Sequence, residues 1–150
     1  MQINTLLGAV FAVAASGAAV KPRDVLYNIS GFSAFCIPHS VQCGYGFRVI
    51  PSTAAPGSNG TICGNLVIGP DNLPPLDLTG CFDPPFAYSI AIADGGLTLT
   101  VTSPLDAQTN ITGTHTATAD QFIIQNGGTT MSQTYVGPQN FTMETVEVAI

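Results

Sequence analysis

The sequence predicts an all-β fold, an antiparallel β-barrel or sandwich of roughly eight to ten short strands with two disulfides. Three observations support this prediction. Apolar residues alternate with threonine, serine and alanine along several short segments, and 16 glycines and 11 prolines interrupt the 150 residues often. No window after residue 20 shows the apolar period of an amphipathic helix. Closure into a barrel would also remove exposed sheet edges, which are a hazard for so β-rich a chain.

The clearest hairpin is expected at Asp94-Gly95, a dipeptide typical of two-residue turns between antiparallel strands. Apolar residues alternate along 88–92 before it and along 97–101 after it. A turn at these two residues sets Ile92 against Leu97 and brings both apolar series to one face. A turn one residue later would keep the same faces.

Alternation and turn residues also place the remaining strands and loops. Gly31 breaks the parity of the apolar positions on either side of it, which indicates a β-bulge. Loops are expected at Pro51–Gly60 and Gly69–Pro75 because of their composition. Further strands are expected at Asp24–Cys36, Cys43–Ile50, Thr61–Ile68, Asn110–Thr118, Gln121–Gln125, Gln133–Val136 and Asn140–Val148.

The first nineteen residues predict a secretory signal peptide, residues 1–19, which leaves residues 20–150 as a single secreted β domain. They combine a short start, an apolar run and small residues before an expected cleavage after Ala18 or Ala19. A later trim could follow Lys21-Pro22-Arg23. The tail, Met143–Ile150, carries two glutamates and lacks the apolar segment of a lipid-anchor signal. We therefore expect a secreted, extracellular protein.

The charge balance argues against two classes of partner. Three lysine and arginine residues oppose nine carboxylates, for a net charge of −6. Lys21 and Arg23 lie beside the expected cleavage region, so Arg48 is the one basic residue in the body of the chain. Binding to nucleic acid or to an anionic membrane surface needs several basic contacts. We expect neither partner.

Four cysteines in an exported chain predict two disulfides, for which three connectivities exist. We favour the sequential pairing, because a hairpin closed by the first pair gathers apolar residues beside the sulfurs. A zinc site is the alternative, although the spacing contains no C-x-x-C pair. The favoured pairs are Cys36–Cys43 and Cys63–Cys81, and in the implied hairpin Ala34 faces Tyr45, Phe32 faces Phe47 and Ser30 faces Val49.

Four N-x-S/T sequons predict a glycoprotein modified at Asn28, Asn59, Asn110 and Asn140. Asn59 lies in a loop rich in glycine, proline and serine, and it is the favoured acceptor. Asn28 and Asn140 fall within expected strands, so their side chains must point outward to be modified.

A search for catalytic residues finds no enzyme motif. The chain has no G-x-S-x-G nucleophile elbow, and His39 and His115 are expected as a loop residue and a solvated strand residue. Asp71, Asp77 and Asp83 suit turns in a loop rich in proline and asparagine. We expect no enzymatic activity, no cofactor and no metal. A hydrolase with dispersed carboxylates stays a third hypothesis, because such pairs meet only in the fold.

Three segments resemble a known family. They are Ile29–Phe47 (ISGFSAFCIPHSVQCGYGF), Thr61–Cys63 (TIC) and Tyr135–Phe141 (YVGPQNF). Together they resemble small secreted hypersensitive-response-inducing protein elicitors of filamentous fungi, and the resemblance covers most of the mature chain. More distantly, residues 63–81 and the alternating strands after them resemble the major Alternaria allergen-like β-barrel family, although the loop at 36–43 is not part of the allergen's pattern.

The resemblance implies a non-enzymatic elicitor or effector. A plant surface receptor would sense it, or it would bind an apoplastic defence protein. The candidate contact surfaces are the 36–43 loop with His39 and the loop that holds Phe82 and Phe86, with structural packing as the alternative for each. A second hypothesis is a secreted small-ligand- or glycan-binding β-barrel, whose apolar residues line a cavity.

Overall fold

A computed structural model describes residues 20–69, 72–127 and 130–150 of the chain. The signal-peptide prediction, residues 1–19, lies outside the described residues, as does Asp71. No helix in the described ranges has the length and apolar character needed to cross a bilayer. The elements are β1 (Val20–Cys36), β2 (Gln42–Pro51), β3 (Thr61–Ile68), β4 (Leu76–Gly80), β5 (Ala87–Ala93), β6 (Gly96–Asp106), β7 (Thr109–Ala117), a 3-10 turn η1 (Ala119–Gln121), β8 (Phe122–Gly127), β9 (Thr130–Tyr135) and β10 (Phe141–Ala149).

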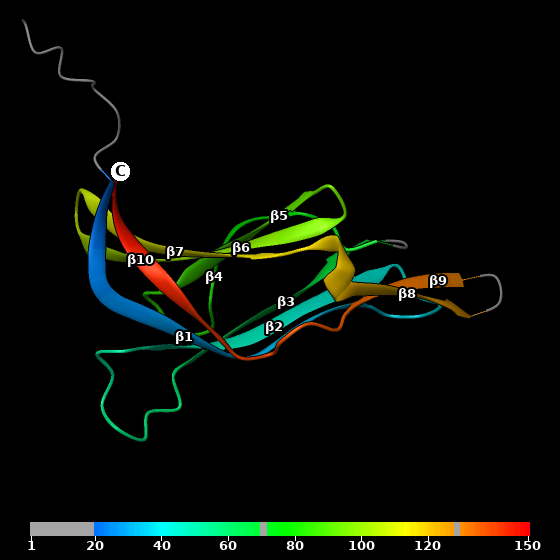
Figure 1. Cartoon of the computed structure of the whole chain (residues 1–150), viewed down its shortest axis with the longest axis horizontal. Coiled ribbons are helices and arrows are strands. Elements are labelled where there is room, and N and C mark those ends of the chain that lie inside the picture. The colour runs from blue at the N-terminus through cyan, green and yellow to red at the C-terminus, as the bar shows by residue number, and fades with distance from the viewer. Residues whose placement is uncertain (1–19, 70–71, 128–129) are drawn as a thin grey trace, which may run out of the picture.

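The strands form an antiparallel sheet that curls into a nearly closed barrel. Its order is β3-β2-β1-β10-β7-β6-β5-β4. β8 and β9 form a hairpin that joins the sheet where Phe35 of β1 pairs with Thr134 of β9. Figure 1 shows β1 and β10 side by side near the C-terminus, and the β8–β9 hairpin extending at the opposite end. The prediction of an all-β barrel with two disulfides is confirmed.

The barrel closes along a seam between its two edge strands, β3 and β4. The Cys63–Cys81 disulfide joins β3 to the residue that follows β4. The amide of Phe82 donates a hydrogen bond of 2.9 Å to the carbonyl oxygen of Ile62 beside it. The second disulfide, Cys36–Cys43, links β1 to β2 within their hairpin. Both disulfides confirm the sequential pairing. At the seam the Cys63–Cys81 bond joins two edge strands that have no hydrogen-bonded ladder between them.

The barrel interior is filled by the alternating apolar residues. Aromatic rings pack edge to face within it, with ring centroids of Phe47 and Tyr88 5.1 Å apart and those of Phe32 and Tyr135 5.0 Å apart. Ile92 is the exception in the 88–101 hairpin, because it is 38% exposed near the turn. The largest side chains that are almost fully buried are Tyr27, Tyr88, Phe32, Leu97, Leu99 and Met143.

Two local predictions from turn chemistry are confirmed. Asp94 and Gly95 both have positive φ, 53° and 75°, and Ile92 pairs with Leu97 as expected. The ladder between β1 and β2 shifts between Ser30 and Ser33, which places the predicted bulge around Gly31.

The same bulge corrects part of the expected hairpin register. Ala34 pairs with Tyr45, as predicted. Beyond the bulge Ser30 pairs with Arg48, not with Val49, because one extra residue in β1 displaces the ladder by one position. β4 is a further difference, since no strand was expected among the prolines and aspartates around it.

Candidate functional site

The candidate contact residues lie in different environments. Phe82 is 73% exposed directly after the seam. Phe86 is half-buried and packs edge-on against Tyr27, with ring centroids 5.6 Å apart. His39 is exposed in the β1–β2 turn with a positive φ of 58°. About six residues of β2 separate that turn from the row beside Phe82, roughly 20 Å of strand, so His39 and Phe82 do not form one site.

Phe82 borders a hollow on the outer face of the sheet formed by β1, β2 and β3. These three strands are neighbours in the sheet (Figure 1). The volume of the hollow is about 550 Å³. We call it the outer groove; its walls are Phe35, Ile62, Leu66 and Phe82, and its floor is Gly44, Gly46 and Gly64. All four wall side chains are exposed apolar residues. Such a grouping differs from singly scattered surface residues, which need no explanation.

Strand register explains why this face is hollow. Ser33, Gly46 and Gly64 stand side by side on β1, β2 and β3, so one row across the sheet carries no large side chain. In the next row Phe35 flanks Gly44. A Cβ at Gly44 would lie 2.9 Å from the Phe35 ring, so the absence of a side chain lets that ring lie over the strand.

The groove continues into a polar end. An adjoining hollow of about 330 Å³ shares Gly46 and Ile62 and adds Ser33 and Arg48. The Ser33 hydroxyl donates to the Gly46 carbonyl oxygen at 3.4 Å. Arg48 Nη1 donates to the carbonyl oxygen of Asn59 at 3.2 Å. Arg48, the one lysine or arginine after residue 23, therefore stands at the end of an apolar surface.

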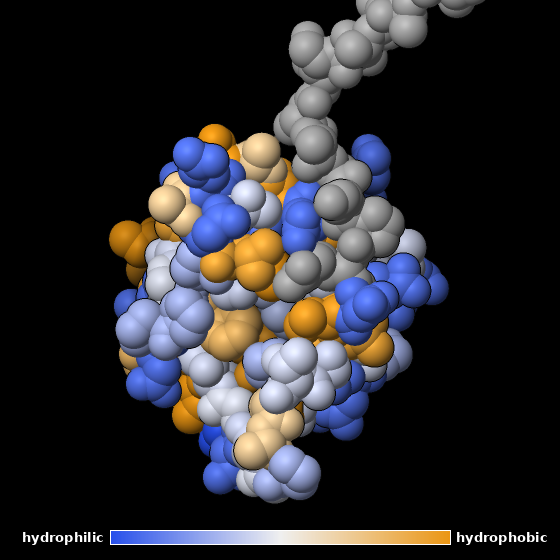
Figure 2. All heavy atoms as spheres, turned by 90° about the vertical axis from the view of Figure 1, so that its left-hand side faces the viewer, coloured by the Kyte–Doolittle hydropathy of each residue, from blue (hydrophilic) through white to orange (hydrophobic). Residues whose placement is uncertain are grey.

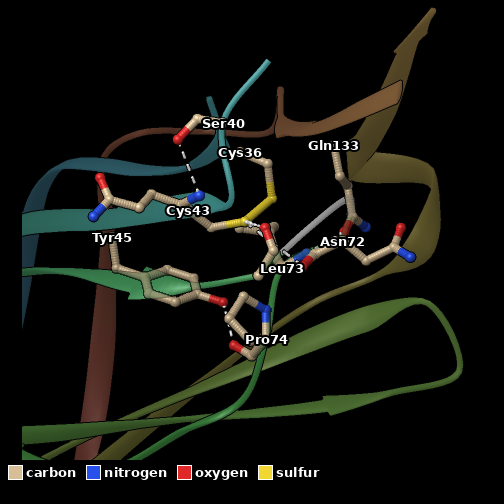
Figure 3. The surroundings of a disulfide bond; sticks show 10 residues. Cys36, Ser40, Cys43, Tyr45, Asn72, Leu73, Pro74 and Gln133 are labelled. Atoms are coloured by element: carbon tan, nitrogen blue, oxygen red, sulfur yellow. Dashed lines mark hydrogen bonds between the residues drawn. A yellow bond between two sulfur atoms is a disulfide. The ribbon is translucent and has the colours of Figure 1, made fainter. Parts of the chain in front are cut away.

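The inner side of β2 is braced beneath the groove. Figure 3 shows the segment with Leu73 and Pro74 packed beside the Cys36–Cys43 disulfide. The Tyr45 hydroxyl donates to the Pro74 carbonyl oxygen at 2.5 Å, and the Leu73 amide donates to Gln133 Oε1 at 2.9 Å. Burial raises the pKa of Tyr45, so this hydroxyl stays a donor at physiological pH. The floor strand is thereby fixed to the β3–β4 loop, and that loop is fixed to β9.

None of the titratable residues considered for catalysis that the structure describes lines the groove, although Asp83 directly follows the wall residue Phe82. His115 is half-buried on the inner side of β7, not solvated as expected, and its ring stacks on Phe141 with centroids 3.7 Å apart. Burial lowers the pKa of His115. Asp77 and Asp83 are exposed. Within the described residues, no three His, Cys, Asp or Glu side chains come together as a metal site.

The sequons occupy surfaces of different accessibility. Asn59 is exposed in the loop that precedes β3. Asn28 and Asn140 are exposed as required, although Asn28 Oδ1 accepts from Thr142 at 2.9 Å and Asn140 Oδ1 accepts from the Gly31 amide at 3.1 Å. Asn110 is half-buried on β7. Modification at these four positions stays a prediction.

No family model matches the chain, and no curated protein matches it. Among solved structures, the chain is similar to the crystal structure of the Alternaria alternata major allergen Alt a 1. The two share 14% sequence identity at a TM-score of 0.49, over 84% of this chain and 96% of the allergen chain.

Sequence reasoning named Phe82 but missed the rest of the groove. One usable signal was present in Gly44-Tyr45-Gly46, where glycines occupy the outward positions of a strand with apolar inward positions. The walls come from β1, β3 and the segment after β4. Their meeting depends on register across three strands, which the separate segments do not reveal.

Proposed function

We propose that this protein is a secreted fungal elicitor or effector that acts without catalysis, by protein–protein recognition. Its partner would be a plant surface receptor or an apoplastic defence protein, and the outcome a hypersensitive defence response. The proposed class of function rests on the sequence resemblance in residues 29–47, 61–63 and 135–141. The observation that supports a recognition role is the outer groove, where four exposed apolar side chains border a hollow.

An interface of this kind gains affinity from a few apolar anchors that are desolvated on contact. Phe82 is the strongest candidate anchor, because most of its ring is exposed while its backbone is held by the seam. The neighbouring disulfide keeps the groove walls in place before binding. Preorganisation of this sort reduces the ordering cost of association. On the face displayed in Figure 2, by contrast with the apolar walls of the groove, apolar and hydrophilic residues are interspersed.

The small-ligand alternative draws support from the volume of the groove, about 550 Å³, which falls within the range of ligand sites. Sites for small molecules or glycans also bring several polar groups together around the ligand. Here the polar side chains are few: Ser33 and Arg48 line the adjoining hollow, and Asn65 lines the groove. The groove also lies on the outer surface of a filled barrel. These features favour a protein partner.

The test is infiltration of the purified, folded protein into leaves, with ion leakage and the oxidative burst as readouts. We expect a response at micromolar doses, and a strongly reduced response for Phe82→Ser and Leu66→Ser. Ile124→Ser on β8 is the matched control, because Ile124 is 57% exposed and Leu66 is 56% exposed. A wild-type protein without effect, or folded groove variants with full potency, would refute the proposal.

A further inference from the structure

Three outward positions of β2 form a graded row. Gly44, Gly46 and Arg48 alternate along the strand, so successive Cα atoms in this row stand about 7 Å apart. Gly44 is covered by the Phe35 ring, while Gly46 is open and its added Cβ would meet only the Ser33 hydroxyl, at 3.3 Å. From Gly44 to Arg48 along β2, the outer surface therefore changes from a position covered by a ring to an open hollow at Gly46 and then to the charged guanidinium.

Arg48 is available for a second partner. Among the described residues it makes one hydrogen bond, to the Asn59 carbonyl oxygen, and a guanidinium carries five N–H donors in a planar fork. No other lysine or arginine follows residue 23. Two parallel N–H groups of a guanidinium can donate to the two oxygens of one carboxylate. A single backbone carbonyl oxygen does not use this pair of donors.

We propose that the outer groove binds an extended segment of the partner protein in which an apolar side chain and a carboxylate stand two residues apart. The apolar side chain enters the hollow over Gly46 and Gly64, between Leu66 and Phe82. The Asp or Glu carboxylate accepts hydrogen bonds from Arg48. The spacing follows because side chains two residues apart in an extended segment match the distance from Gly46 to Arg48. This inference rests on the proposed function, since it specifies the partner of the same surface.

Charge makes the inference specific. A protein of net charge −6 would attract basic partners through its overall field, and such attraction weakens with salt. The groove instead presents Arg48 beside an apolar hollow. A segment with an apolar and an acidic side chain therefore complements this surface, although the net charge of the protein repels acidic partners. Association should therefore depend on Arg48 more than on the total charge of the chain.

The first experiment compares ion-leakage dose–response curves for wild type, Arg48→Gln, Arg48→Glu and Gly46→Val. Arg48→Glu should raise the half-maximal dose by about tenfold or more, because it sets two carboxylates against each other. Gly46→Val should abolish the response by filling the hollow while the protein stays folded, since a β-branched residue suits a strand. Gln125→Glu on β8 changes the net charge as much as Arg48→Gln does, and it should have no effect.

These variants separate the two proposals. Loss of the response in Phe82→Ser with full potency in Arg48→Glu would refute the acidic-segment inference while the proposed function stands. A wild-type protein that elicits nothing would refute the proposed function, and the peptide titration below would still test the groove.

The second experiment titrates the isotope-labelled protein with three acetylated, amidated peptides that differ at one position, Leu-Thr-Glu, Leu-Thr-Gln and Leu-Thr-Lys, each flanked by serines. We expect amide shifts at Gly46, Arg48 and Gly64 that saturate at the lowest concentration with the glutamate peptide. Equal shifts with all three would overturn the charge assignment. Sedimentation analysis adds another outcome, because a dimer that Gly46→Val dissolves would show that a second copy occupies the groove and would refute the inference.

Discussion

Two buried tyrosines differ in what their hydroxyl groups contact. The Tyr27 hydroxyl lies 2.6 Å from Ser103 Oγ and donates to the Ile111 carbonyl oxygen at 3.3 Å. The Tyr88 hydroxyl is buried without a hydrogen-bond partner among the described residues. Burial raises the pKa of both groups, to about 12 for Tyr88, so each stays neutral at physiological pH. The contrast matters because an unpartnered buried hydroxyl costs free energy that a bonded one recovers.

Replacing each tyrosine by phenylalanine should therefore affect the free energy of unfolding differently. Tyr27→Phe leaves the Ser103 hydroxyl without its partner and should lower the free energy of unfolding by about 1–2 kcal/mol. Tyr88→Phe removes an unsatisfied group and should leave that free energy unchanged or raise it. Urea unfolding followed by circular dichroism measures both. Equal destabilisation by the two substitutions would contradict this account.

His115 predicts a pH dependence of stability. Burial lowers its pKa below the ordinary value of 6.5, so the unfolded chain takes up the proton first as the pH falls. The contribution of His115 to stability is thus present above pH 6.5 and is lost progressively below it, until the folded-state pKa is reached. We expect His115→Phe, which can keep the stack on Phe141, to flatten this slope. The readout is the difference in unfolding free energy between the two proteins from pH 7.5 to pH 5; an identical slope in both would count against it.

At the scale of elements, the edge strands β3 and β4 decide how the barrel closes. Neither has a neighbouring strand on its free side in the sheet order. The Cys63–Cys81 bond and the amide of Phe82 bridge them instead. Because Ile62 and Phe82 are groove walls, the seam also holds the outer groove together.

Replacing both Cys63 and Cys81 by alanine should therefore open the seam locally. On the chain-entropy model the loss of this closure costs about 3 kcal/mol, against about 2.5 kcal/mol for the shorter Cys36–Cys43 closure. Hydrogen exchange is the sharper measurement, because amides of β3 and β4 should exchange faster while those of the β6–β7 ladder keep their protection. Uniform acceleration across the barrel would show that the disulfide stabilises the whole fold and not the seam.

Elements differ in how well the sequence predicts them. The 88–101 hairpin and the bulge at Gly31 were predictable because Asp94-Gly95 and a parity change are local signals. β4 was not, because Leu76–Gly80 is short and lies among turn-forming residues, and its pairing with β5 supplies the order that its own composition lacks. The groove was predictable only in part, through Phe82 and the alternating glycines, because its depth arises from three strands in register.

At the scale of the whole molecule, the proposed recognition depends on the closed barrel. The groove walls come from β1, β3 and the segment after β4, which are separate in the sequence and adjacent only in the fold. The floor strand β2 is supported from the inside by Tyr45 and its bond to Pro74. A partner that reads the groove must therefore read a folded, oxidised protein and not one stretch of chain.

Protein that has been reduced, alkylated and heat-unfolded should consequently lack the proposed elicitor activity. Reduction removes both disulfides, which removes the covalent closure of the seam and of the β1–β2 hairpin, so Phe82 separates from the β3 walls Ile62 and Leu66. Ion leakage at matched doses measures the loss, and an oxidised sample that has been heated, cooled and shown to refold controls for damage by heat. A synthetic peptide covering residues 29–47 should also be inactive, because it contains β1 and β2 positions but none of the walls from β3 or the seam. Full potency of the unfolded protein or of the peptide would mean that the plant detects a linear epitope, and the groove would then lose its assigned role.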